Sequence, residues 1–263
     1  MEHLVIVRGG GDIATGIAHR LHRSGFAVAV TELARPIMVR RSVAFAQAVF
    51  DGQITVEGVT AQTAALGEIR TVVAQGKVPV IIDARADCVN LLKPAIVVDA
   101  ILAKYNTGTH CGQARTVIGV GPGFTAGVDV HAVVETMRGH HLGRVYYAGT
   151  AIADTGIPGE IAGYTMERLL RAPASGAFSA CRQIGDAVTA GEVVGEVNGV
   201  QVTALVPGII RGLIQDGIMV EKDMKLGDID PRCCREHCFT ISDKARAVAG
   251  GVLEAVMHRS KVV

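Results

Sequence analysis

A group of glycines stands near the start of the chain, between an apolar run and an amphipathic one. In LVIVRGGGDIATG, Gly9, Gly11 and Ala14 fit the spacing G-x-G-x-x-A. Glycines at this spacing let the backbone approach a pyrophosphate, and the N-terminus of the following helix supplies N–H donors. Glu32 closes the next apolar run, about 20 residues on, where a carboxylate can bind a ribose hydroxyl. The segment therefore predicts a ligand-binding loop made of Gly9, Gly10, Gly11, Asp12 and Glu32.

The same segment has a second interpretation. Asp12 places a negative charge at the predicted helix start, which suits the helix dipole but competes with a phosphate. Arg35, Arg40 and Arg41 could meet a phosphate-bearing ligand instead. The alternative is that the glycines only form a tight turn, because one fold can serve many functions.

More polar residues and glycines follow later apolar runs. Asp83 follows VPVII, Asp99 follows AIVV, and Gly121 and Gly123 follow RTVIGV. Ligands of open α/β sheets bind outside the carboxyl ends of the strands, so these residues are expected to converge, with Lys104 as a cation for a phosphate. Asp83 and Asp99 could instead cap helices or turns.

The sequence CCREHC places four soft ligands in six residues, namely Cys233, Cys234, His237 and Cys238. Thiolates and imidazoles bind zinc or copper, and a thiolate can also handle sulfur or selenium. The spacing is not that of a standard zinc finger, so an exposed cluster without a metal is the alternative interpretation. Disulfides are not expected in the cytoplasm, where we expect this protein to be.

The alternation of short apolar runs with helical patterns predicts the elements that would position these residues. Strands are expected at 4–8, 27–32, 78–84, 95–104, 115–121 and 143–149, with helices at 12–24, 37–49, 61–75 and 128–137. This order predicts an α/β fold with a Rossmann-like parallel sheet over residues 1–175.

The composition changes after residue 175 toward glycine, valine and turn residues. Residues 184–197 and 216–229 form a weak internal repeat, and Asn198-Gly199 between them indicates a hairpin. Residues 176–231 resemble a biotinyl/lipoyl-type barrel-sandwich, although the hairpin tip lacks the lysine that carries biotin or lipoate. Residues 232–263 are expected to form a Cys-rich segment and a C-terminal helix.

The composition excludes several function classes. The formal net charge is +1 and aromatic residues make up 4% of the chain. These values do not indicate binding to nucleic acid or to an anionic membrane. No apolar run reaches the length of a membrane span, and no signal peptide is expected at the N-terminus.

Several long motifs together resemble the YqeB-type accessory proteins of the selenium-dependent molybdenum hydroxylase system. They are RGGGDIATGIAHRLHRSGF, RRSVAFAQAVFDG, VDAILAKYNTGT, GVGPGFTAGVDVHAVVETMRGHHLGRV, TGIPGEIAGYTMERLLRAP and ISDKARAVAGGVLEAV. The glycine loop is also similar to the Rossmann domain of XdhC-type proteins, which help insert the sulfurated molybdenum cofactor.

The resemblance implies an accessory protein in the maturation of a molybdenum hydroxylase. The glycine loop would then hold a nucleotide such as NAD(P) or the molybdenum cofactor, and the cysteine cluster would hold zinc or handle selenium or sulfur. The partners would be the hydroxylase or its cofactor-synthesis proteins, with a homo-oligomer as a further option. An NAD(P)-dependent oxidoreductase and a non-catalytic docking protein are the alternatives.

Overall fold

The computed structural model describes residues 4–260, which divide into two units. The larger unit contains residues up to Pro36, Phe45–Thr155 and the chain from Ile241 onward. The smaller unit contains Ile37–Ala44 and Gly156–Thr240. Each unit is therefore assembled from segments that are far apart in the sequence.

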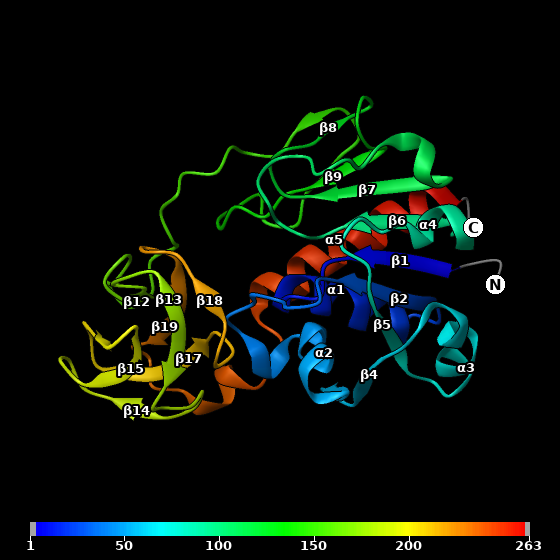
Figure 1. Cartoon of the computed structure of the whole chain (residues 1–263). Helices are drawn as coiled ribbons and strands as arrows, with labels where there is room; N and C mark the ends of the chain where they lie inside the picture. The colour runs from blue at the N-terminus through cyan, green and yellow to red at the C-terminus, as the bar shows by residue number, and fades with distance from the viewer. Residues whose placement is uncertain (1–3, 261–263) are drawn as a thin grey trace. The chain divides into compact units, whose positions relative to one another are not determined.

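A nine-stranded sheet forms the centre of the larger unit (Figure 1), in the order β10-β9-β7-β6-β1-β2-β5-β4-β3. The strands from β4 to β9 in this order are parallel, whereas the two outermost pairs, β3 with β4 and β9 with β10, are antiparallel. The bounds are β1 Leu4–Arg8, β2 Ala27–Glu32, β3 Gln53–Val56, β4 Val59–Thr63, β5 Val78–Ile82, β6 Ile96–Asp99, β7 Thr116–Val120, β9 Ala132–Val134 and β10 Val145–Tyr146.

Every residue of β1 and β7 is buried, as expected for apolar strands in the middle of a sheet. Two helices account for most of the helical structure, α1 (Asp12–Arg23) and α5 (Asp243–Ser260). Figure 1 shows α5, in red, lying beside α1, in blue. The other helices are one or two turns long, namely α2 Ala48–Asp51, α3 Ile69–Ala74 and α4 Cys88–Leu92. A small ribbon pairs β8 (Thr125–Ala126) with β11 (Gly149–Thr150).

The smaller unit consists of two four-stranded antiparallel sheets, ordered β12-β19-β17-β14 and β16-β15-β13-β18. The predicted hairpin joins β15 and β16, and its tip residues Asn198 and Gly199 have φ angles of 51° and 77°. Positive φ at both positions is the requirement of a tight hairpin turn. The bounds are β12 Leu169–Arg171, β13 Gly176–Ala180, β14 Ala187–Val188, β15 Val193–Val197, β16 Val200–Thr203, β17 Gly208–Leu213, β18 Met219–Val220 and β19 Lys225–Asp230.

The predicted fold class, a Rossmann-like parallel sheet followed by a biotinyl/lipoyl-type barrel-sandwich, is wrong. The nine-stranded sheet is mixed, and no α-helix of the described chain lies between β6 and β10. The smaller unit begins before residue 176, because it includes β12, and it also takes in Ile37–Ala44. The domain boundaries at 175 and 231 stay predictions.

Three of the four predicted helices are also corrected. The segment 61–75 begins inside a hairpin, because Glu57 and Gly58 have φ angles of 44° and 77° and turn β3 back into β4. The segment 128–137 contains β9, which adds its short apolar run to the side of β7. The segment 37–49 holds two 3-10 turns, Arg41–Val43 and Phe45–Gln47, before α2 begins. The spacing of apolar residues alone did not distinguish these short segments from helices.

Among residues 4–260, the structure contains no helix that combines the length and the apolar character required to span a bilayer.

Candidate functional site

The centre of the candidate site lies where the strand order of the sheet reverses. The strands that follow β1 in the chain, from β2 to β5, lie on one side of β1 in the sheet. The next strands, β6 and β7, lie on its other side. Arg8 ends β1 and Asp99 ends β6, and the two residues pair in register across these neighbouring strands. Ligands of open sheets commonly bind outside the strand ends at such a reversal.

Arg8 and Asp99 form a buried ion pair at this point. Their exposed fractions are 3% and 1%, and Arg8 Nη1 lies 3.0 Å from Asp99 Oδ2. The hydroxyl of Thr109 donates to the same carboxylate oxygen over 2.6 Å, and Arg8 also donates to that hydroxyl. The backbone N–H of Ile101 donates to the other carboxylate oxygen over 3.2 Å. Asp99 thus ties both ends of the loop after β6 to the end of β1.

That loop has an unusual backbone and is packed closely by glycines. Leu102 and Lys104 have φ angles of 61° and 68°, a region that non-glycine residues rarely occupy without support from their surroundings. A Cβ at Gly9 would lie 3.1 Å from the Ala100 carbonyl oxygen, and one at Gly123 would lie 2.7 Å from Tyr105 Cα. The glycines therefore permit the ends of β1 and β7 to approach the loop.

A group of charged side chains lies at the same edge, around the start of α5. Lys104 Nζ contacts Asp154 Oδ2 at 2.6 Å. Arg138, which follows β9, donates to both carboxylate oxygens of Asp243 over 2.8 and 3.1 Å. The remaining cation of the group is Lys244. Its ammonium group forms no hydrogen bond and no ion pair with residues 4–260.

Lys244 is half-buried in the first turn of α5. Burial lowers the pKa of its ammonium group and the charge of Arg138 lowers it further, while Asp12, Glu135 and Asp154 act in the opposite direction. These charges lie close enough to Lys244 to shift its pKa, so the start of α5 lies near the ends of β9 and the start of α1.

Glu135 is fully buried beside this group, but its carboxylate is already occupied. One oxygen accepts the backbone N–H groups of Thr136 and Met137 over 2.8 and 2.7 Å, and the other accepts that of Ile152 over 2.8 Å. Three N–H donors satisfy the carboxylate, so Glu135 holds the segment 135–152 together at the sheet edge.

The glycine loop uses its predicted ribose-binding acid internally. The Gly10 N–H donates to Glu32 Oε1 over 2.8 Å, and the Leu33 N–H donates to Oε2 over 2.7 Å. Burial raises the pKa of Glu32, and these two N–H groups partly oppose the shift. The Gly10 carbonyl accepts the N–H of Ala46 over 2.9 Å, so the chain's own backbone covers this part of the loop. A Cβ at Gly11, in contrast, would meet nothing within 4 Å.

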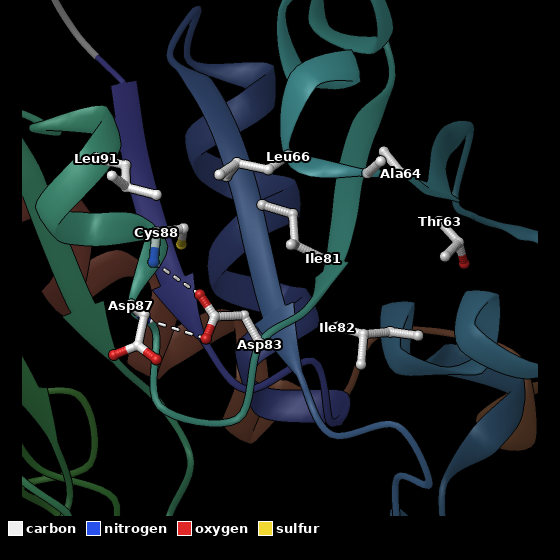
Figure 2. A pocket seen from close by; sticks show the side chains of 10 residues that line it. Thr63, Ala64, Leu66, Ile81, Ile82, Asp83, Asp87, Cys88 and Leu91 are labelled. Carbon is white, nitrogen blue, oxygen red and sulfur yellow. Dashed lines mark hydrogen bonds between the residues drawn. The ribbon is translucent and has the colours of Figure 1, made fainter.

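A pocket of about 480 Å³ opens beside the carboxyl end of β5 (Figure 2). Apolar side chains dominate its wall, including Ile82 and Leu91 with exposed fractions of 51% and 70%. Asp83 lines the pocket and points toward the start of α4. Its oxygens accept the N–H groups of Asp87 and Cys88 over 3.0 and 2.8 Å, so Asp83 acts as a helix-capping residue.

The pocket electrostatics follow from these contacts. Burial alone would raise the pKa of Asp83, but hydrogen bonds from Cys88, Asp87 and Arg85 outweigh it and lower the pKa. Burial, together with the hydrogen bond and charge of Asp83, raises the pKa of the Cys88 thiol to about 12. Cys88 is therefore a protonated thiol under ordinary conditions and does not serve as a nucleophile.

The structure separates the predicted binding residues into two groups. Close backbone approaches link Gly9 to the loop after Asp99, and Gly121 and Gly123 to the segment around Lys104. Glu32 and Asp83 lie at the ends of β2 and β5, where the Asp83 N–H donates to the Glu32 carbonyl over 2.9 Å, and Gly10 joins them through its hydrogen bond to the Glu32 side chain. Sequence reasoning missed five residues at this edge because their strand and helix partners are distant in the chain: Arg8, Thr109, Glu135, Arg138 and Lys244.

The predicted metal ligands belong to the smaller unit and lie in different surroundings. Cys238 is buried and its thiol donates to the Ile210 carbonyl, whereas the Cys233 side chain is exposed. His237 Nδ1 lies 3.9 Å from Asp230 Oδ2. Within residues 4–260, no three His, Cys, Asp or Glu side chains are arranged to hold a metal ion. Cys233, Cys234, His237 and Cys238 stay predicted ligands without support from the geometry.

Comparison with known proteins gives one extensive sequence match. No family model matches the chain. The chain is 49% identical over 257 residues to "Uncharacterized protein YqeB" of Escherichia coli (strain K12), which covers 97% of this chain and 48% of the relative. The chain thus spans about half the length of the curated relative it matches. The expected similarity to YqeB is confirmed, but the relative's name states no function.

Solved structures give weak matches. A succinylglutamatedesuccinylase/aspartoacylase from Rhodobacter sphaeroides is 13% identical, with 87% of this chain and 85% of that chain covered and a TM-score of 0.27. The ectoine utilization protein EutE (DoeB) from Ruegeria pomeroyi is 10% identical, with coverages of 86% and 84% and a TM-score of 0.27. TM-scores this low do not establish a common fold.

These findings correct the description drawn from the resemblance. The mixed sheet is not the predicted Rossmann nucleotide-binding domain, and the name of the matched relative states no function. The identity of the ligand and of any partner protein stays a prediction. What the comparisons do show is a chain that is similar to YqeB over nearly its whole length.

Proposed function

We propose that the larger unit binds a small molecule through a carboxylate or phosphate group at the carboxyl edge of its sheet, with Lys244 as the principal contact. The observation that carries this proposal is the half-buried ammonium group of Lys244, which has no hydrogen-bond or ion-pair partner within residues 4–260. A partly desolvated cation without a partner is costly, and an anionic ligand would offset that cost.

The charged neighbours of Lys244 favour a ligand over an internal partner. Asp154 already pairs with Lys104, and Asp243 already pairs with Arg138. Glu135 accepts three backbone N–H groups. Because these carboxylates have partners of their own, Lys244 is the group best placed to attract an anion from solution.

The position in the fold supports the same conclusion. The long helices α1 and α5 pack together near their N-terminal ends, since a Cβ at Gly16 would lie 2.9 Å from the Ala245 Cβ. The N-terminus of a helix carries a partial positive charge and N–H groups that attract anions. The backbone loops of four strands meet at this edge, where glycines allow them to approach one another.

Isothermal titration of the full chain with malonate, citrate and pyrophosphate tests the proposal. We expect binding of at least one of these anions, and a dissociation constant roughly ten- to hundredfold larger for Lys244→Met, which removes a charge-assisted hydrogen bond. Lys244→Arg keeps the positive charge and should retain part of the affinity.

Two control variants locate the ligand. Lys222→Met removes an exposed lysine of the smaller unit and should leave the affinity unchanged. Leu91→Asp alters the wall of the pocket in Figure 2, at a side chain that is 70% exposed. A loss of affinity in Leu91→Asp with none in Lys244→Met would place the ligand in that pocket and refute the proposal.

A further inference from the structure

The smaller unit contains a buried cluster of arginines that the proposed function does not use. Four guanidinium groups, of Arg40, Arg168, Arg211 and Arg232, gather around two carboxylates, of Asp228 and Asp230. Asp230 is fully buried, and Arg40, Arg168 and Arg211 each have an exposed fraction of 7%, whereas the Arg232 side chain is 41% exposed. Clusters of buried arginine at this density require compensation of their charge.

Most members of the cluster have partners. Arg232 binds Asp230 with two parallel hydrogen bonds of 2.9 and 2.6 Å. Arg168 donates to Asp228 over 3.2 Å and to the Gly159 carbonyl over 3.1 Å. Arg40 donates to the carbonyl oxygens of His237 and Thr240 over 2.8 and 3.2 Å. These bonds leave Arg211 as the exception.

Arg211 has no hydrogen bond to any residue between 4 and 260. Its Nε atom is buried without an acceptor, and the nearest carboxylate oxygen, Asp230 Oδ2, lies 3.9 Å away and already accepts from Arg232. Burial lowers the pKa of Arg211, and the charge of Arg40 lowers it further. A guanidinium group remains charged in a protein, so burial leaves a cation that must share the Asp230 carboxylate with Arg232.

His237 contributes a further buried atom without a hydrogen-bond partner, as do Arg168 Nε and Asp228 Oδ1 in the same cluster. Its Nδ1 atom is buried, lies 3.9 Å from Asp230 Oδ2 and has no hydrogen-bond partner within the described residues. The segment Asp230–Cys238 therefore brings Arg232 and His237 to the cluster, while Cys238 lies next to it as a thiol whose pKa burial raises. This arrangement gives the CCREHC motif a structural role that does not require a metal ion.

The charge balance indicates the ligand. The guanidinium groups of this cluster outnumber its two carboxylates, and the Arg232 side chain, which is 41% exposed, opens the cluster to solvent. We propose that this cluster is a binding site for a tetrahedral oxyanion with two negative charges, such as a phosphate or sulfate group, held by Arg211 with His237 and Arg40 beside it. Guanidinium groups match the oxygens of such an anion in geometry as well as in charge.

Thermal unfolding of the full chain in increasing phosphate tests this site, with sodium chloride at equal ionic strength as the reference. The measurements use the Lys244→Met background, which separates this site from the one in the larger unit. We expect phosphate to raise the unfolding midpoint beyond the effect of chloride, because a ligand that binds only the folded state stabilises it. In Arg211→Met the apparent dissociation constant should be roughly ten- to hundredfold larger.

The baseline without phosphate separates binding from general loss of structure. Arg211→Met removes a buried charge that shares its carboxylate with Arg232, so its midpoint without phosphate should equal or exceed that of the parent. Arg182→Met, which removes an exposed arginine of the same unit, should keep the full response to phosphate. His237→Gln provides a milder second variant, with a weakened response expected.

Two results would overturn the proposal. One is an equal midpoint increase for phosphate and for chloride in the parent protein. The other is an unchanged phosphate response in both Arg211→Met and His237→Gln. Either result leaves the proposal for Lys244 untouched, because that site is tested by a separate titration and by a different variant, Lys244→Met.

Discussion

At the level of single residues, Asp83 shows how one carboxylate can satisfy two interpretations of a sequence. It follows an apolar strand, as a ligand-binding acid would, and it lines the pocket in Figure 2. Both of its oxygens nevertheless accept N–H groups from the first residues around α4. These hydrogen bonds agree with the capping interpretation, which the sequence offered as an alternative, and ligand binding by Asp83 stays a prediction.

The contact between Asp83 and Cys88 gives a prediction about thiol reactivity. Because the pKa of Cys88 is raised from 9.0 to about 12, its thiolate fraction should be about a thousandfold lower than that of an unperturbed thiol. We expect iodoacetamide at mildly alkaline pH to label the exposed Cys181 and Cys233 and to leave Cys88 unlabelled, as read by peptide mass spectrometry.

Variants of the neighbouring acids sharpen this measurement. Asp83→Asn removes the charge that raises the Cys88 pKa and should increase the labelling of Cys88. Asp87→Asn removes an exposed and weaker contributor and should change it little. Rapid labelling of Cys88 in the unmodified protein would show that the thiol is neither buried nor protonated as described.

At the level of elements, the packing of α1 on α5 is the contact that brings Lys244 to the sheet edge. The two helices are separated by more than 200 residues in the chain, yet they lie side by side (Figure 1). Gly16 makes this approach possible, because a Cβ there would lie 2.9 Å from the Ala245 Cβ. The amphipathic pattern predicted each helix, but neither pattern named its partner.

Two helical glycines provide a matched test of this packing. Gly250→Ala lies on α5 where a Cβ meets nothing within 4 Å, and it should raise the free energy of unfolding by roughly 1 kcal/mol through helix propensity. Gly16→Ala gains the same propensity but crowds Ala245, and overpacking costs about 1–3 kcal/mol. We therefore expect urea unfolding to show Gly16→Ala as the less stable variant. Equal stabilisation by both substitutions would contradict the close approach of α1 and α5.

At the level of the whole molecule, each unit depends on a segment from elsewhere in the chain. In the smaller unit, the Val39 carbonyl accepts the Leu213 N–H over 2.7 Å. Arg41 donates to the Leu213 carbonyl over 2.7 Å and to the Gln215 side chain over 2.8 Å. The segment Ile37–Ala44 is thus an integral part of this unit rather than a linker.

This arrangement predicts the behaviour of a fragment. Residues 156–240 produced alone lack the segment 37–44, so they should melt at a lower temperature than the same residues with 37–44 joined to their N-terminus by a flexible linker. Circular dichroism at increasing temperature measures the difference. Identical melting curves would mean that the hydrogen bonds from Val39 and Arg41 contribute nothing to the stability of this unit.

The sequence by itself determined the local features of this protein. The buried strands β1, β2, β5, β6 and β7, the helix after the glycine loop and the Asn198-Gly199 hairpin each follow from hydrophobic period and turn chemistry within a few residues. The sequence also identified the strand ends that carry Asp83, Asp99 and the glycines, because polar residues directly after apolar runs are visible in a single chain.

Only the tertiary structure decided which of these features meet. The mixed edges of the sheet, the entry of residues 37–44 into the smaller unit, and the convergence of Lys244 with Arg138 all join segments that are distant in sequence. The same holds for Arg211 Nε and His237 Nδ1, which are buried and find no hydrogen-bond partner within residues 4–260. Burial and pairing depend on the whole fold, because the cost of a charge is set by every group that surrounds it.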